Sequence, residues 1–256
     1  MEYFAGIDIG SSTAKFTVID SSGTIIGKAM KRSGVDYGKT AGELLSLVCE
    51  KASIDRSSIL KVISTGYGRE NVTWSDGKMT EIACHSKGAF YHFRKRMTII
   101  DIGAQDSKVI HLDDKGKRIA FKMNRKCAAG TGAFIEEVAH RLALEINELN
   151  GLAERSTENV ELGSFCTVFA ATEVIEKIRA GVAVEDIVRG AFSSVAKRIV
   201  EMDSVEGMLV TTGGVVAHNP HLAKMLGEAF GTEAFITPDA QYMGAFGAAL
   251  YAAEGK

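Results

Sequence analysis

Ile7-Asp8-Ile9-Gly10 recurs as Ile100-Asp101-Ile102-Gly103, 93 residues later. The match continues downstream at the same offset, in the pairs Lys15 and Lys108, Asp20 and Asp113, and Gly23 and Gly116. Each copy reads as a strand, a glycine turn, a second strand, a polar turn and a third strand. The repeat therefore predicts a duplicated β-meander, and with it two related lobes with a cleft between them.

The turn after the first strand of each copy has the residues of a phosphate-binding loop. Gly10 lets the backbone turn tightly, so that the amides and hydroxyls of the next three residues can point at phosphate oxygens. Those residues are Ser11, Ser12 and Thr13. In the second copy, Gln105 and Asp106 are placed to orient an attacking water.

Asp8 and Asp101 end the two predicted strands and are expected to face each other across the cleft. Two carboxylates there suit Mg²⁺, which keeps several waters and takes one or two protein carboxylates together with phosphate oxygens. A single D-x-G sequence marks no more than a turn. Because the sequence repeats at matching phase, we favour a nucleotide site.

A third glycine signal lies at 207–215, where a short apolar strand runs into Thr-Thr-Gly-Gly and a helical stretch from His221 to Phe230 follows. A flat glycine pair at a strand end permits close approach by a nucleoside, and the N-terminus of the next helix favours anionic groups. We therefore expect Gly213 and Gly214 to contact the adenosine.

Four cysteines, at 49, 84, 127 and 166, match no metal-binding spacing. Cys127 precedes a helical pattern in which apolar residues recur at three- and four-residue steps as far as Ile146, and Cys166 precedes a second helical run that Gly181 closes. At a helix N-terminus the macrodipole and free amides stabilise anionic sulfur. Two thiolates are half of a Cys₄ site, and a symmetric dimer would complete it. Core or reactive cysteines are an equally open interpretation.

The chain has 256 residues, of which 46% are hydrophobic and 24% charged, and this composition is typical of a soluble globular protein. A net charge of −2 gives no basic field for nucleic acid or an anionic membrane. The start lacks the pattern of a signal peptide, and no stretch is apolar enough to span a bilayer. We expect a cytoplasmic protein whose thiols stay reduced.

Duplicated D-x-G loops with a late T-G-G resemble the phosphate-1, phosphate-2 and adenosine motifs of the acetate and sugar kinase, Hsp70 and actin superfamily. The resemblance implies an α/β fold of two ribonuclease H-like, actin-like lobes, with ATP and Mg²⁺ in the cleft between them. We draw the lobes at 1–95 and 96–256, the last helix packing back on the first lobe.

Longer motifs narrow the resemblance: K-C-A-A-G-T-G at 126–132, C-T-V-F-A at 166–170, S-T-G-Y-G-R at 64–69 and E-x-x-C-H at 81–85. Together they resemble the ATP-dependent activators of 2-hydroxyacyl-CoA dehydratases, a group that includes subunits of benzoyl-CoA reductase and reductases of double-cubane cluster proteins. The resemblance implies one 4Fe-4S cluster per homodimer, held by Cys127 and Cys166. It also implies an iron–sulfur acceptor enzyme, reduced ferredoxin or flavodoxin as the electron source, and an anaerobic host.

Within this resemblance Asp8, Asp101 and Gln105 are the expected catalytic residues, and the two aspartates hold Mg²⁺, through water. The expected nucleotide-binding residues are Gly10, Ser11, Ser12, Thr13, Lys15, Gly103, Ala104, Gln105, Asp106, Gly130, Thr131, Gly132, Gly213, Gly214, Val215 and Gln241. Ala104 stands where the family has a second glycine, and its methyl group is expected to narrow the phosphate-2 loop.

Two rival functions fit the same loops. A sugar-type kinase predicts a sugar-dependent ATPase without iron, and a non-redox nucleotide switch predicts tight ATP binding with little turnover. We expect neither Cys84, in E-x-x-C-H, nor Cys49, inside a predicted helix, to bind the cluster. The favoured interpretation is an ATP-hydrolysing iron–sulfur homodimer that delivers low-potential electrons.

Overall fold

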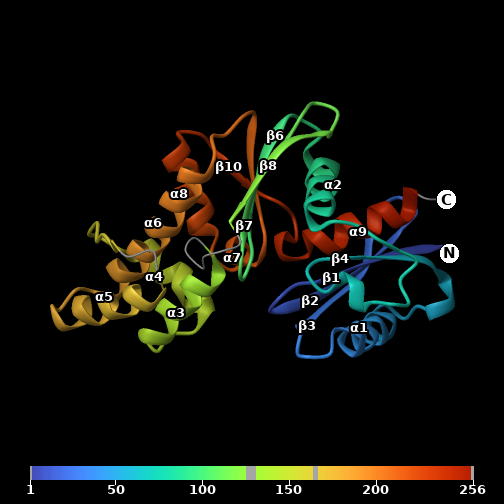
Figure 1. Ribbon diagram of the computed structural model, residues 1–256, viewed down its shortest axis with the longest axis horizontal. Coiled ribbons are helices and arrows are strands. Elements are labelled where there is room, and N and C mark those ends of the chain that lie inside the picture. The colour runs from blue at the N-terminus through green and yellow to red at the C-terminus, as the bar shows by residue number, and fades with distance from the viewer. Residues whose placement is uncertain (1, 125–130, 164–166, 255–256) are drawn as a thin grey trace. The chain divides into compact units, whose positions relative to one another are not determined.

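The computed structural model describes residues 2–124, 131–163 and 167–254. The chain forms two compact units, one of Met1–Arg94 with Tyr242–Lys256 and the other of Lys95–Gln241. Each unit contains one five-stranded mixed sheet flanked by helices (Figure 1).

In the first unit the strand order is β3-β2-β1-β4-β5. β1 (Tyr3–Ile9), β2 (Thr13–Asp20) and β3 (Ile25–Arg32) form an antiparallel meander, while β4 (Ile59–Thr65) runs parallel to β1 and β5 (Gly77–Lys78) parallel to β4. The helices are α1 (Tyr37–Ala52), α2 (Glu81–Phe93) and α9 (Met243–Glu254), with 3-10 turns at Arg56–Ser58 and Arg69–Asn71. Asp36 and Thr80 cap α1 and α2 by accepting backbone N–H groups of the first turn.

The closing helix α9 packs within this first unit, against β1 and α2 (Figure 1). Its small residues allow backbone to meet backbone: a Cβ on Gly6 would overlap the carbonyl of Ala245, and one on Gly247 would overlap that of Cys84. The last helix thus packs closely against the first sheet, within the first unit.

In the second unit the order is β10-β9-β6-β7-β8. The strands are β6 (Met97–Ile102), β7 (Ser107–Leu112), β8 (Arg118–Asn124), β9 (Met208–Thr212) and β10 (Ala234–Ile236). The helices are α3 (Gly132–Arg141), α4 (Leu149–Arg155), α5 (Thr167–Arg179), α6 (Val184–Met202), α7 (Gly214–His218) and α8 (Pro220–Phe230), with 3-10 turns at Ile146–Glu148 and Ala240–Tyr242.

The two sheets have the same topology, since an antiparallel meander is extended in each by two parallel strands. The register also repeats, because Asp8 lies opposite Lys15 in the first sheet as Asp101 lies opposite Lys108 in the second. The duplicated meander predicted from the repeat is thus confirmed. The duplication reaches further than predicted, to the fourth and fifth strands of each sheet.

The helix expected to run from Phe134 to Ile146 is shorter than predicted. α3 ends at Arg141, and Ala143 turns the chain with a φ of 54° before a 3-10 turn begins at Ile146. Residues beyond the turn still pack on the same core, which explains why the apolar spacing looked continuous. For α5 the predicted end is confirmed, since Gly181 has a φ of 76° and follows the helix closely.

Along the parts of the chain that the structure describes, no helix combines the length and the apolar character needed to cross a membrane.

Candidate functional site

Asp8 and Asp101 occupy equivalent places near the carboxyl ends of β1 and β6, and both are buried. The loop after each strand is closed by the same backbone hydrogen bond. Gly10 N donates to Thr13 O at 3.1 Å, and Gly103 N donates to Asp106 O at 2.9 Å. The two predicted phosphate loops are therefore tight turns of one design, with Ser11 exposed in the first and Gln105 exposed in the second.

Asp101 belongs to a buried ion cluster. Lys108 Nζ lies 3.0 Å from Asp101 Oδ2 and 2.8 Å from Asp106 Oδ1, and the Lys108 side chain is 0% exposed. One ammonium group therefore ties the carboxylate at the end of β6 to the tip of the phosphate-2 loop. Such a cluster fixes the loop, because separating its charges would leave one of them buried and uncompensated.

Asp8 has different surroundings, although its register position is the same. Lys15 Nζ donates to the carbonyl of Thr13 at 3.3 Å and so braces the phosphate-1 loop through its backbone. Asp8 is enclosed by two glycines: a Cβ on Gly66 would overlap its Oδ1, and one on Gly244 would lie 2.7 Å from its Oδ2. The two copies of the repeat thus share an aspartate, a glycine and a lysine at equivalent positions, but these residues are held by different contacts.

The first glycine of the pair after β9 is required by packing within the second unit. Gly213 has a φ of 100°, and a Cβ there would lie 2.5 Å from the carbonyl oxygen of Ile102 and 2.7 Å from Asp101 Oδ1. Gly214 is covered by the side chain of Gln241, whose Nε2 lies 3.4 Å from the place of a Cβ. The sequence analysis expected both glycines to be needed for close approach by a nucleoside. For Gly213 the structure supplies a different reason, the packing of its own backbone against Ile102 and Asp101.

Gln241 is held over this turn from two sides. The carbonyl of the preceding residue, Ala240, accepts hydrogen bonds from Gly213 N and from Thr212 Oγ1, both at 3.0 Å. His218 Nε2 donates to Gln241 Oε1 at 3.2 Å. Val215, by contrast, is buried in the core.

The start of α3 is joined to the phosphate-2 loop. Gly132 N donates to Gly103 O and Ala133 N donates to Ala104 O, both at 2.8 Å. A Cβ on Gly132 would lie 3.1 Å from the Gly103 oxygen and 3.2 Å from Ala104 Cα, so a larger residue would separate helix and loop. These two amides are therefore bound by the chain itself. Ala104 contributes a carbonyl to this junction.

Thr131 and Gly132 lie at this junction, as the N-cap and first residue of α3. Three of the expected site residues, Gly130, Cys127 and Cys166, fall outside the residues that the structure describes.

Cys84 is buried in α2, and burial raises the pKa of its thiol to about 12. A thiolate, the form that ligates metal and reacts with alkylating agents, is therefore disfavoured. We expect iodoacetamide at pH 8 to leave Cys84 unlabelled in the folded protein under conditions that label it fully in denaturant, as peptide mass spectrometry would measure. Labelling at the same rate in both states would contradict the structural role assigned to this cysteine.

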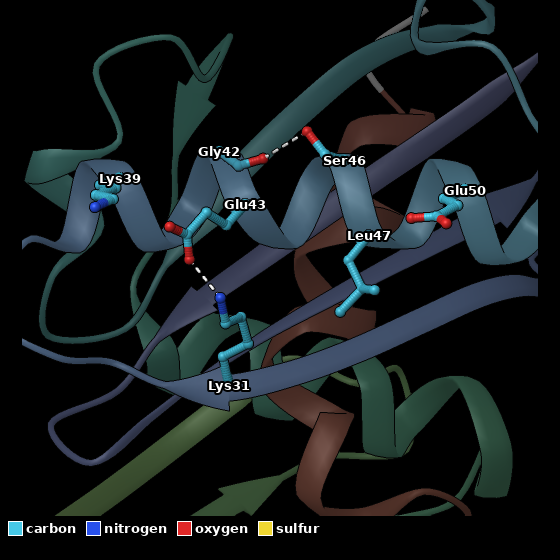
Figure 2. A pocket seen from close by; sticks show the side chains of 7 residues that line it. All are labelled: Lys31, Lys39, Gly42, Glu43, Ser46, Leu47 and Glu50. Carbon is cyan, nitrogen blue, oxygen red and sulfur yellow. Dashed lines mark hydrogen bonds and ion pairs between the residues drawn. The ribbon is translucent and has the colours of Figure 1, made fainter.

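A shallow groove lies over α1 and the end of β3 (Figure 2). Lys31 donates to Glu43 across it, and this hydrogen bond lowers the pKa of the Glu43 carboxyl. Ser46 donates to the carbonyl of Gly42 one turn earlier (Figure 2). Lys31 and Glu43 are exposed and neutralise each other, so this pair offers no catalytic arrangement.

The sequence reasoning missed two features of the site. Lys108 stands out in the sequence only as a repeated residue, because its buried ion pairs depend on the β6–β7 register. The turn at Gly66 fits a plain loop equally well, although it closes over Asp8 as Gly213 closes over Asp101. A Thr-Gly pair at the end of an apolar strand, present in both halves, is the signal that would have found it.

This chain has two matching mixed sheets, each with a tight loop and a buried aspartate at the equivalent strand end. This is the fold of the actin-like ATPases. Within that class, the chain belongs to the BadF/BadG/BcrA/BcrD ATPase family, whose model matches residues 5–252.

Alignments with named relatives extend over nearly the whole chain. The (R)-2-hydroxyglutaryl-CoA dehydratase activating ATPase of Acidaminococcus fermentans is 39% identical over 98% of this chain and 96% of its own. The activator of lactoyl-CoA dehydratase from Anaerotignum propionicum is 38% identical over 98% of this chain and 98% of its own. A solved structure of the activator of the 2-hydroxyisocaproyl-CoA dehydratase from Clostridium difficile, with bound ADPNP, has 37% identity and a TM-score of 0.93 over 98% of this chain and 94% of its own.

Proposed function

We propose that this protein hydrolyses ATP to drive low-potential electrons into an iron–sulfur partner enzyme, either a 2-hydroxyacyl-CoA dehydratase or a double-cubane cluster protein. The observation that carries the proposal is the junction between α3 and the phosphate-2 loop. Gly132 and Ala133 donate hydrogen bonds to this loop. A shift of the loop on exchange of ATP for ADP would therefore move the start of the helix that follows Cys127. Relatives named as activators of dehydratases support the choice of partner.

The nucleotide part rests on the two tight loops. Backbone and hydroxyl groups of 10–13 and 103–106 would hold phosphates, and Asp8 and Asp101 would hold Mg²⁺ through water. The surroundings of Asp101 fit a water-mediated role, since Lys108 already occupies its Oδ2. Gln105, exposed in its loop, would position the attacking water.

The redox part rests on Cys127 and Cys166, which would each be supplied twice by a homodimer. When bound, a 4Fe-4S cluster provides a one-electron centre whose potential depends on hydrogen bonding and solvent exposure. The contribution of this chain would be to displace α3 and α5, the helices that follow the two cysteines, when the nucleotide changes. We propose reduced ferredoxin or flavodoxin as the electron source and the cytoplasm as the location.

Anaerobic purification and a transfer assay test the function. We expect a brown protein that reduces a dehydratase or double-cubane acceptor with ATP and not with ADP. Equal midpoint potentials and equal transfer rates with the two nucleotides would contradict the proposal. A sugar-dependent ATPase would instead support the kinase alternative, which the relatives named as activators do not favour.

The substitution Asp8→Asn tests the assigned role of the carboxylate. The amide has the same shape, so it fits between Gly66 and Gly244, but it lacks the charge that Mg²⁺ requires. We expect Mg²⁺-dependent ATP hydrolysis to fall by about 100-fold or more, with the unfolding midpoint nearly unchanged.

Asp20→Asn is the matched control. Asp20 ends the neighbouring strand β2, and its Oδ1 accepts the N–H of Ser22 in a turn, a bond that an asparagine oxygen also accepts. Equal ATPase rates for Asp8→Asn and Asp20→Asn would show that Asp8 has no part in the reaction.

A further inference from the structure

The turn at the end of β4 is the counterpart, in the first unit, of the Thr-Thr-Gly-Gly turn in the second. Thr65 lies beside Asp8 in the parallel register, as Thr212 lies beside Asp101. The next residue is a glycine with positive φ in both turns, 86° at Gly66 and 100° in the second unit. The sequence repeat at an offset of 93 residues does not pair these two turns with each other.

The contacts of the two glycines are also the same. A Cβ on Gly66 would overlap Asp8 Oδ1 and lie 2.6 Å from the carbonyl oxygen of Ile9. A Cβ on Gly213 would meet the corresponding atoms of Asp101 and Ile102. Each turn therefore closes over the aspartate of its own sheet, and the duplication includes this part of the candidate site.

The residue after the glycine differs between the two turns. The second unit has Gly214, which the side chain of Gln241 covers. The first unit has Tyr67, whose side chain is 77% exposed. The fold does not need this aromatic ring for its core, so the ring is accessible to a ligand.

Tyr67 stands on a braced turn. Gly68 N donates to Ile9 O at 2.9 Å, Arg69 Nη1 donates to Gly66 O at 3.1 Å, and a Cβ on Gly68 would clash with Ile9 Cγ2. Ser64 Oγ also donates to the carbonyl of Arg69, at 3.1 Å. A turn held in this way presents its outward side chain in a defined place, which lowers the entropy cost of binding a ligand.

The turn also lies at the edge of the sheet where a ligand is expected. β1 and β4 are parallel neighbours, so their carboxyl ends share one edge, and ligands of open α/β sheets bind outside such ends. The phosphate-1 loop at 10–13 leaves β1 at that edge. Tyr67 lies two residues beyond the end of β4, and its phenol is a hydrogen-bond donor.

We propose that Tyr67 is a ligand-contact residue of the nucleotide site, whose hydroxyl donates a hydrogen bond to a phosphate oxygen of a nucleotide bound at the 10–13 loop. This inference rests on the proposed function, because it takes the bound ligand to be a nucleotide. A protein surface, including a second copy of this chain, is the competing occupant.

Chemical modification distinguishes these occupants. The full-length protein is treated with N-acetylimidazole, with and without Mg²⁺ and saturating ADPNP, and the modified tyrosines are quantified by peptide mass spectrometry. We expect the nucleotide to slow the modification of Tyr67 by about tenfold and to leave Tyr3, at the opposite end of β1, unchanged. Protection that depends on protein concentration and not on the nucleotide would overturn the inference in favour of a second copy.

The variant Tyr67→Phe tests the hydroxyl itself. We expect its Kd for ATP in the presence of Mg²⁺, measured by equilibrium dialysis, to rise by about tenfold, while Tyr3→Phe binds as the unchanged protein does. Unchanged affinity in Tyr67→Phe would overturn this inference alone. Failure of the unchanged protein to bind ATP would overturn the proposed function and this inference with it.

Discussion

Cys127→Ala and Cys166→Ala are each expected to give a colourless protein with essentially no bound iron, against about four iron atoms per dimer in the unchanged chain. The proposed site takes two thiolates from each protomer, so either substitution removes half of the ligands. Iron analysis and absorbance after anaerobic reconstitution measure the effect, and gel filtration under the same conditions reports the dimer.

Cys49→Ala is the matched control for this prediction. Cys49 is half-buried in α1 of the first unit, where it packs against the core, and we expect this variant to keep its iron. Full iron content in both Cys127→Ala and Cys166→Ala would contradict the cluster. So would a colourless unchanged protein after reconstitution.

Lys108→Met is expected to lower the free energy of unfolding by about 3–5 kcal/mol, the typical cost of leaving a buried charge without its partner. The ammonium group is fully buried between Asp101 and Asp106, and methionine fills the space without the charge. Denaturant unfolding measures the loss. We also expect ATP hydrolysis to fall, because the phosphate-2 loop loses the group that ties it to β6.

The internal repeat offers the control. Lys15→Met alters the equivalent register position in the first sheet, where the ammonium group donates to a backbone carbonyl in a partly exposed setting. We expect a loss of about 1 kcal/mol there. The double substitution Asp101→Asn with Lys108→Met should recover part of the stability. Equal losses in the two single variants would show that the buried pair has no special weight.

Much of the fold could be predicted from the spacing of local signals. The alternation of apolar residues, the glycine turns and the offset of 93 residues predicted both meanders, because strands and tight turns depend on short-range backbone preferences. The helix after Cys127 was predicted too long. Leu144 and Ile146 pack against the same core as α3, but they lie beyond its end. Periodicity reports burial, and burial does not require one continuous helix.

The candidate site also has a part that could be predicted from the sequence and a part that could not. Asp8, Asp101 and the residues of both loops were predicted, because the side chains and the turns that carry them are adjacent in sequence. The reason for Gly213 was not, since this glycine is required by Ile102 and Asp101, which come from a distant segment.

Local patterns in the sequence were enough to predict the duplicated architecture and its two glycine loops, and they carry the family motifs around the cysteines. Three features could be seen only in the folded chain: Lys108 is shared between Asp101 and Asp106, α3 begins on the 103–106 loop, and the Gly66 turn repeats the Gly213 turn. Each of these features depends on strand register and on the close approach of backbone atoms. In the sequence, the only sign of such a contact is a single lysine or glycine.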